Sequence, residues 1–250
     1  MTTADLKSSI VCLAVVMITS RAAAHVAPSV DDNNRYVKVT PFGDRVRLAY
    51  TVFFGEVPGA IQRRELDVNH DGTITEAEAH AFGEKLAAEV RQGVELEIDG
   101  AVSPFIWSTI DVGMGTNAVA AGSFSIDLIG TGCFATARGA HTIRLHDRFR
   151  IAHPGETEIK VEDGMGIAIG KAHVGAVDDP SHDYKFAGPG GPLTDDGLEL
   201  VIDAGPRSTV SPDATCSATG HATSRLWIYL AIAAALSVFG GVALVLRRRT

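Results

Sequence analysis

The chain has 250 residues, 46% of them hydrophobic and 21% charged, and its formal net charge at pH 7 is −8. This length and balance suit a globular protein with a real core and exclude a wholly disordered chain. The acidic excess argues against nucleic acid or anionic lipid headgroups as partners, and three cysteines are too few for a disulfide-rich scaffold.

The first 24 residues have the layout of a secretory signal. Lys7 precedes an apolar run over residues 10–18, and the small residues 22–24 form an A-x-A cleavage site. A short buried helix is the alternative interpretation. The sequence therefore predicts a signal peptide over residues 1–24 and a mature chain that begins at His25.

The other end of the chain has the layout of a single membrane span. Residues 226–246 contain no charged side chain and are long enough to cross about 30 Å of hydrocarbon. Trp227 and Tyr229 suit the outer interface, and the three arginines at 247–249 suit the cytoplasmic face. We expect a transmembrane helix over 226–246, a cytoplasmic tail over 247–250, and a domain held in the periplasm or on the cell surface.

The segment between the two ends is acidic, with a net charge of −12 over residues 25–225. Such a surface is compatible with divalent cations. Cys133 and Cys216 both lie in this segment and could pair in an oxidising compartment, although nothing requires it. Residues 205–225 are rich in Ser, Thr, Ala, Pro and Gly, which predicts a flexible tether to the membrane.

Residues 25–204 are predicted to form an antiparallel β-sandwich. Apolar and polar residues alternate with the period of a strand in several short segments separated by glycine turns. These segments are 45–54, 94–98, 123–130, 141–147, 157–161 and 197–202. Pro58 and Gly59 are expected to close the first strand unit, and residues 178–197 are expected to form a long loop.

An EF-hand-like insert over residues 60–93 is predicted to interrupt the strands. Its second helix has Thr75 as the N-cap and Glu78 three residues later, the pattern of a capping box. Gly83 within that helix costs about 1 kcal/mol relative to alanine. We therefore expect a packing reason for Gly83 or a weak point in the helix.

The loop of this insert, "DVNHDGTITEAE" at 67–78, matches the EF-hand pattern D-x-D/N-x-D/N-G-x5-E at every defined place. Calcium prefers six to eight oxygen ligands, and Gly72 permits the sharp turn that brings them together. Side-chain oxygens, one backbone carbonyl and a closing bidentate carboxylate would supply the site. The predicted ligands are Asp67, Asn69, Asp71, Thr73 through its carbonyl, Thr75 directly or through water, and Glu78.

Some alternatives for this loop stay open. A degenerate loop would keep the shape and bind nothing. Glu78 cannot fully cap the helix and chelate calcium at once, and we expect it to be a ligand.

The sequence contains no second EF-hand loop, so a structural site is expected rather than a sensor. Ile74 is expected to reach the core or a partner loop. Outside the cell a dissociation constant of about 10⁻⁴–10⁻³ M suffices for such a module.

The layout of residues 24–170 is similar to that of a known exported domain. The motifs "AAAHVAPS", "RVRLAYTVFFGEVPG", "ELDVNHDGTITEAEA" and "VELEIDG" resemble the N-terminal domain of bacterial nickel/cobalt permease-like proteins of the hydrogenase and urease accessory type. Those proteins have several membrane helices, whereas one is predicted here. The resemblance therefore implies a domain that handles divalent metals or partners a membrane permease, without transport activity of its own.

The C-terminus resembles the sorting tails of some Gram-negative bacteria, with Cys216, a polar spacer, an apolar helix and "RRR". In that case the helix would be removed and the mature domain displayed on the cell surface. Whether the helix is retained or processed stays open.

No catalytic residue is predicted, because the sequence contains no G-x-S-x-G, H-E-x-x-H or C-x-x-C motif. The expected function is a calcium-binding module in binding or surface presentation, not an enzyme. The alternative is an accessory nickel, cobalt or copper protein, in which the amine and imidazole of His25 would add a second metal site. A hydrolase with a structural calcium ion is the third and weakest hypothesis.

Overall fold

A computed structural model of the protein describes residues 30–134, 139–164, 166–188 and 191–204. The predicted signal peptide, tether, membrane span and tail lie outside these residues. Within the described ranges, no helix is both long and apolar enough to cross a membrane.

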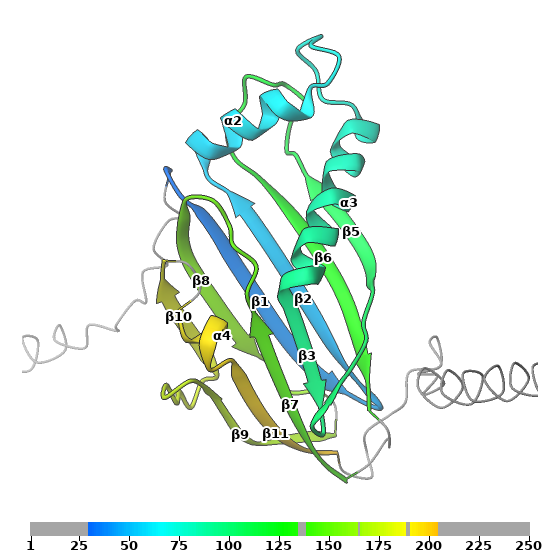
Figure 1. The fold of residues 1–250 in the computed structure, drawn as a ribbon, viewed down its shortest axis with the longest axis vertical. Coiled ribbons are helices and arrows are strands. Elements are labelled where there is room, and N and C mark those ends of the chain that lie inside the picture. The colour runs from blue at the N-terminus through cyan, green and yellow to red at the C-terminus, as the bar shows by residue number, and fades with distance from the viewer. Residues whose placement is uncertain (1–29, 135–138, 165, 189–190, 205–250) are drawn as a thin grey trace, which may run out of the picture.

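Two sheets make up most of the fold (Figure 1). In spatial order, the first consists of β10 (Asp183–Ala187), β8 (Pro154–Val161), β1 (Asn33–Phe42), β2 (Arg45–Phe54), β6 (Phe124–Cys133) and β5 (Trp107–Gly113). The second consists of β4 (Ala101–Val102), β3 (Val94–Ile98), β7 (Gly139–Asp147), β11 (Leu198–Ala204) and β9 (Ile167–Val174). The mainly β fold with mostly antiparallel sheets is confirmed, but β1 and β8 pair in parallel, which the purely antiparallel prediction did not include.

A single hydrophobic core joins the sheets and the helices. Strand β2 shows how the sequence produces this core, since alternate residues from Val46 to Phe54 are buried while the residues between them are partly or fully exposed. Helices α2 (Glu56–Leu66) and α3 (Glu76–Gly93) cover the part of the first sheet that the second sheet leaves free, at the upper end of Figure 1. A short helix, α4 (Pro192–Asp195), precedes β11.

The helical insert begins earlier than the sequence predicts. Pro58 and Gly59 were expected to end a strand unit, but they lie in the first turn of α2, which Gly55 caps. Proline is tolerated there because the first turn has no intrahelical acceptor for its missing N–H. A Cβ on Gly59 would lie 2.7 Å from the carbonyl oxygen of Gly122, so this glycine lets α2 approach the loop before β6.

The long loop expected over 178–197 is also wrong, since it contains β10 and α4. Strand β10 has five residues, and Tyr184 is the one that is fully buried, which leaves no alternating pattern to detect. Strand β5 lies at the edge of its sheet and exposes four of its seven residues. Short or edge strands of this kind form through tertiary pairing, which local sequence does not reveal.

Gly83 has the packing reason that was expected of it. A Cβ at this position would lie 2.8 Å from Val112 Cγ2 and 3.0 Å from Ile110 Cγ2, so the glycine lets α3 contact β5 closely. We expect Gly83→Ala to lower the free energy of unfolding by about 1–2 kcal/mol, because the clash outweighs the gain of about 1 kcal/mol in helix propensity. Urea denaturation measures the change.

The exposed Ala88 on the same helix is the control for Gly83. Ala88→Gly should cost about 1 kcal/mol through propensity alone. A Gly83→Ala variant more stable than the natural protein would contradict the close contact with β5.

The single described cysteine, Cys133, ends β6 and is disulfide-bonded. Cys12 and Cys216 lie outside the described residues. The pairing of Cys133 with Cys216 therefore stays a prediction.

Candidate metal site

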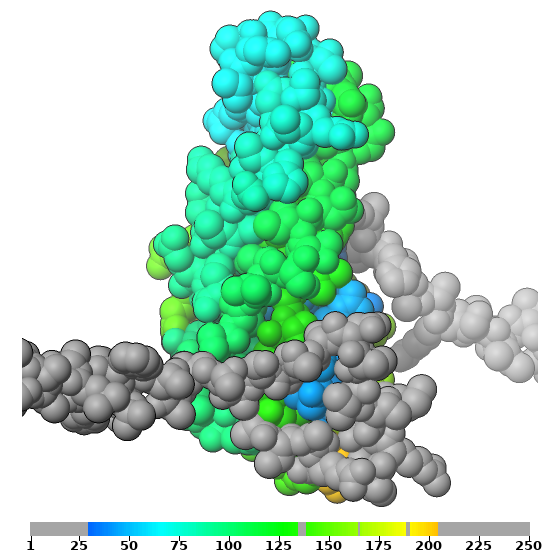
Figure 2. Space-filling model, turned by 90° about the vertical axis from the view of Figure 1, so that its right-hand side faces the viewer, coloured from blue at the N-terminus to red at the C-terminus, as the bar shows by residue number. Residues whose placement is uncertain are grey.

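The loop between α2 and α3 turns back on itself at the outer end of the domain (Figures 1 and 2). Gly72 has a φ of 84°, and a Cβ there would meet nothing within 4 Å, so conformation alone calls for a glycine. His70 also adopts a positive φ, 59°. The tight bend predicted at Gly72 is thus present, with a second left-handed residue two positions before it.

Three side chains of the predicted ligand set hold the loop in its curve. The buried Asp67 accepts hydrogen bonds from the backbone N–H of Asp71 at 3.1 Å and of Gly72 at 3.0 Å. Asn69 Oδ1 accepts from the N–H of Asp71 at 3.0 Å, and Asp71 Oδ1 from that of Thr73 at 2.8 Å. These bonds draw the side chains of Asp67, Asn69 and Asp71 onto one short arc of backbone.

Glu78 caps α3. Its Oε2 accepts from the N–H of Thr75 at 2.9 Å and from the Thr75 hydroxyl at 2.8 Å, while Thr75 Oγ1 accepts from the N–H of Glu78 at 3.2 Å. Its Oε1 accepts from the N–H of Val68 at 3.0 Å. The capping box that Thr75 and Glu78 indicate is therefore present. Glu78 serves as the helix cap here, whereas the role expected for it, that of a metal ligand, stays a prediction and would require it to leave Thr75.

The pKa of Glu78 is lowered, chiefly by the backbone N–H of Thr75 and then by the Thr75 hydroxyl. These donors stabilise the ionised carboxylate. The same charged form is the one that a calcium ion requires. At neutral pH the side chain is thus in the correct protonation state for either role.

Residues 72–74 of the loop pair with the segment 114–123, which precedes β6. The N–H of Ile74 donates to the carbonyl of Asn117 at 2.8 Å, and that of Val119 donates to the carbonyl of Gly72 at 3.2 Å. Thr73 and Ala118 form an antiparallel bridge between these bonds. The Ile74 side chain is buried in the core. Ile74 therefore reaches both the core and a partner loop, the two alternatives predicted for it.

Arg63 of α2 holds this partner segment in place. Its side chain is 0% exposed, and burial lowers its pKa. The guanidinium donates to backbone carbonyls of Gly122 at 2.9 Å, Thr116 at 2.8 Å, Ala118 at 3.1 Å, Ser123 at 3.2 Å, and also Met114. It lies 5.5 Å from the ring centroid of Phe124. One buried cation therefore joins five carbonyl groups of the partner segment to α2.

Sequence reasoning missed Arg63, although a signal was present. The residue lies four positions after Gly59 and three before Leu66, which are both buried, so it falls on the inner stripe of α2. A charged residue on such a stripe calls for many hydrogen-bond partners. The partners themselves are 51 to 60 residues away in sequence, which no local pattern indicates.

The predicted ligands of the loop carry the oxygen donors that a hard cation prefers, but the last of them, Glu78, points toward the helix cap. The predicted ligands Asp67, Asn69, Asp71, Thr73 and Thr75 offer oxygen atoms in the order that calcium sites use. In the ranges that the structure describes, however, no group of three or more His, Cys, Asp or Glu side chains converges closely enough to hold a metal. The orientation of Glu78 toward the helix cap is consistent with this finding.

No protein-family model matches the chain, and no curated protein sequence matches it. The residues of the loop and of its partner segment are therefore the basis for a functional assignment.

Proposed function

We propose that the protein is a calcium-binding module exported and tethered to the membrane, in which an EF-hand-like insert on a β-sandwich serves binding or surface presentation. The observation that carries the proposal is the loop at 67–78. It matches the calcium-binding pattern at every defined place, and hydrogen bonds from Asp67, Asn69 and Asp71 already curve its backbone.

The assignment of roles follows from these contacts. Asp67, Asn69 and Asp71 would supply side-chain oxygens, Thr73 its carbonyl, and Thr75 its hydroxyl directly or through water. Bound calcium supplies a divalent positive charge that offsets the clustered carboxylates. Glu78 would exchange its contacts with Thr75 for two contacts with the ion. Thr75 Oγ1 could still accept from the N–H of Glu78, so α3 would keep half of its cap.

A structural role suits this insert better than a sensor role. The loop is joined to segment 114–123 through Ile74, and Arg63 fixes that segment to α2. Calcium would stabilise this corner of the domain, for which an affinity of about 10⁻⁴–10⁻³ M is enough outside the cell. The disulfide at Cys133 supports an oxidising compartment and therefore export.

Calcium should raise the melting temperature of the purified protein. At a calcium concentration of 100 times the dissociation constant, a ligand that binds only the native state adds about 2.7 kcal/mol to the free energy of unfolding. For a domain of this size we expect a rise of about 5–10 °C, measured by differential scanning calorimetry. Glu78→Gln should lose more than half of that rise, because it removes one charge from the ligand set.

Glu84→Gln is the matched control for Glu78→Gln, since Glu84 is an exposed carboxylate on α3 outside the ligand set. It should keep the full calcium-dependent rise. An equal rise in both variants would contradict the assignment of Glu78. A rise with Ni²⁺ or Co²⁺ but none with Ca²⁺ would instead favour the accessory divalent-metal role that the permease resemblance implies.

A further inference from the structure

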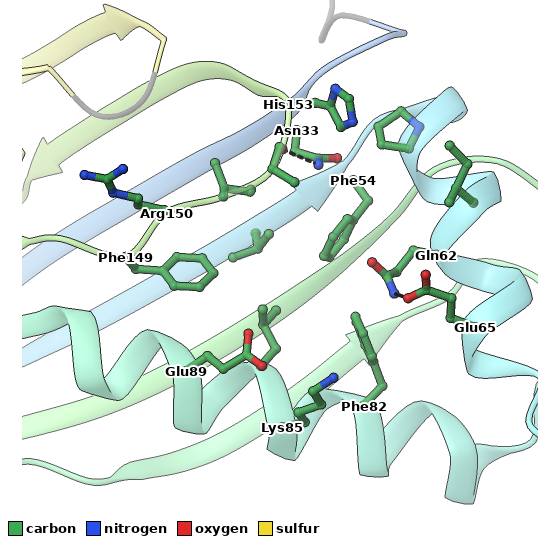
Figure 3. Close-up of a pocket in the computed structure, with 16 residues that line it drawn as sticks. Asn33, Phe54, Gln62, Glu65, Phe82, Lys85, Glu89, Phe149, Arg150 and His153 are labelled. Carbon is green, nitrogen blue, oxygen red and sulfur yellow. Dashed lines mark hydrogen bonds between the residues drawn. The ribbon is translucent and has the colours of Figure 1, made fainter.

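The hollows on the described part of the domain differ in their balance of charge. The groove between α2 and α3 holds Lys85 and Arg150 together with Glu65 and Glu89, so its charges balance (Figure 3). Another hollow, of about 500 Å³, lies across β8, β1 and β2 on the face of the first sheet that points away from the core. We call it the outer hollow, and its main members are Lys38, Thr40, Arg47, Ala49, Lys160 and Glu162.

The outer hollow has an excess of positive charge, although the whole chain carries a net charge of −8. Three cations and two carboxylates line it. Both carboxylates already have a lysine partner, Glu162 through Lys38 at 3.0 Å and Glu158 through a lysine of β10 at 3.1 Å. Arg47 and Lys160 are exposed, and neither forms an ion pair with another described residue. These two cations are therefore available to an anionic ligand.

The outer hollow exists because a small residue lies among larger ones. Residues of β2 alternate between the core and the outer face, and Ala49 lies on the outer face between Arg47 and Thr51. Its neighbours on the adjacent strands are Lys38 of β1 and Ile129 of β6. A single methyl group surrounded by longer side chains leaves space above the sheet.

We propose that the outer hollow binds an acidic sugar, a hexose ring that carries one carboxylate, as in glucuronate. The site lies apart from the calcium loop and does not depend on it. Arg47 on β2 and Lys160 on β8 stand on either side of β1, so the strands that carry them are ~10 Å apart. Both long side chains can reach a carboxylate held between them, and the guanidinium can bind it through two parallel hydrogen bonds.

The other side chains of the outer hollow suit the hydroxyl groups of a sugar. Glu158 and Glu162 can accept hydrogen bonds from them, and the Thr40 hydroxyl can donate or accept. Burial raises the pKa of Tyr36, so its phenol stays protonated and can also donate. A nucleic acid would bring several negative charges close to the two carboxylates, which would repel it. One carboxylate flanked by hydroxyls matches both kinds of group in the hollow.

Saturation-transfer difference NMR on the purified full chain tests which ligand binds. Calcium is removed beforehand, so that it cannot bridge the protein and the sugar. Glucuronate should bind at least about ten-fold more tightly than glucose, because only the acid makes charge-assisted hydrogen bonds. It should exceed acetate by about the same factor, because acetate makes none of the hydroxyl contacts. Absence of glucuronate binding, or an equal affinity for glucose or acetate, would overturn the proposal.

Variants of the full chain test where the sugar binds. Arg47→Ala should weaken glucuronate binding by about ten-fold, because it removes a charge-assisted contact. Ala49→Leu keeps every charge but fills the outer hollow, and it should weaken binding at least as much. The control is Lys171→Ala, which removes a cation that is 60% exposed on β9 of the second sheet. Its effect should stay below about two-fold, because exposed charges far from the ligand are screened.

These variants separate a shaped site from general attraction between charges. An affinity unchanged by Arg47→Ala or by Ala49→Leu would overturn the outer hollow as the binding site. Equal losses in Arg47→Ala and Lys171→Ala would do the same, since they would show that any surface cation contributes. The three side chains lie outside the core, so an unchanged melting temperature is expected for each variant.

Discussion

Replacement of Arg63 by alanine is expected to lower the free energy of unfolding by about 3–5 kcal/mol, because it leaves several buried carbonyls without donors. The guanidinium is completely buried and contacts five carbonyls of segment 114–123. Arg63→Lys should recover only part of the loss, since one ammonium group cannot reach so many acceptors. Urea denaturation gives both values.

The neighbouring Arg64 provides the control, because its side chain is exposed. Arg64→Ala should change the free energy of unfolding by less than about 0.5 kcal/mol. Arg63→Ala should also weaken calcium binding, since Asn117 in the released segment pairs with Ile74 of the loop. Similar stabilities for the two alanine variants would show that segment 114–123 does not depend on Arg63.

The second large effect is expected at Asp147, where the two sheets are joined. Its Oδ2 accepts from Arg35 Nη1 at 2.6 Å and from the Tyr50 hydroxyl at 2.7 Å, and its Oδ1 from the N–H of Phe149 at 2.9 Å. Arg35 and Tyr50 belong to the first sheet, whereas Asp147 ends β7 of the second. Burial raises the pKa of Tyr50 well above its usual value, so its hydroxyl stays a donor.

Asp147→Ala should lower the free energy of unfolding by about 3–5 kcal/mol, because it leaves the buried cation of Arg35 without its carboxylate. The double variant Arg35→Met with Asp147→Leu should lose less than Asp147→Ala, since it removes both charges. Chemical denaturation of the three proteins measures the differences.

The surface pair Lys38–Glu162 is the control for the buried pair. Lys38 Nζ and Glu162 Oε1 are 3.0 Å apart, but the two side chains are 48% and 40% exposed. Glu162→Ala should therefore cost no more than about 1 kcal/mol. A loss at Asp147 as small as that at Glu162 would mean that the buried pair does not tie the sheets together.

Features encoded by a few consecutive residues could be predicted from the sequence. The alternation in β2 predicted its buried face, Thr75 and Glu78 predicted the capping box, and Gly72 predicted the left-handed turn of the loop. In each case the residues that determine the structure lie within one element or one turn. Local stereochemistry is then sufficient.

Features that depend on distant partners could not be predicted. The parallel pairing of β1 with β8 joins residues more than 110 positions apart. The carbonyl groups that accept hydrogen bonds from Arg63 lie in segment 114–123, and so does the backbone that pairs with Ile74. That segment has no hydrophobic pattern or motif of its own.

Isothermal titration calorimetry with calcium tests most directly whether the loop at 67–78 is a metal site. The account predicts one calcium ion per chain with a dissociation constant of about 10⁻⁴–10⁻³ M or lower, and loss of the binding heat in Asp67→Ala. Asp67 carries the buried carboxylate of the loop. An absence of binding heat at millimolar calcium, with an unchanged melting temperature, would contradict the account.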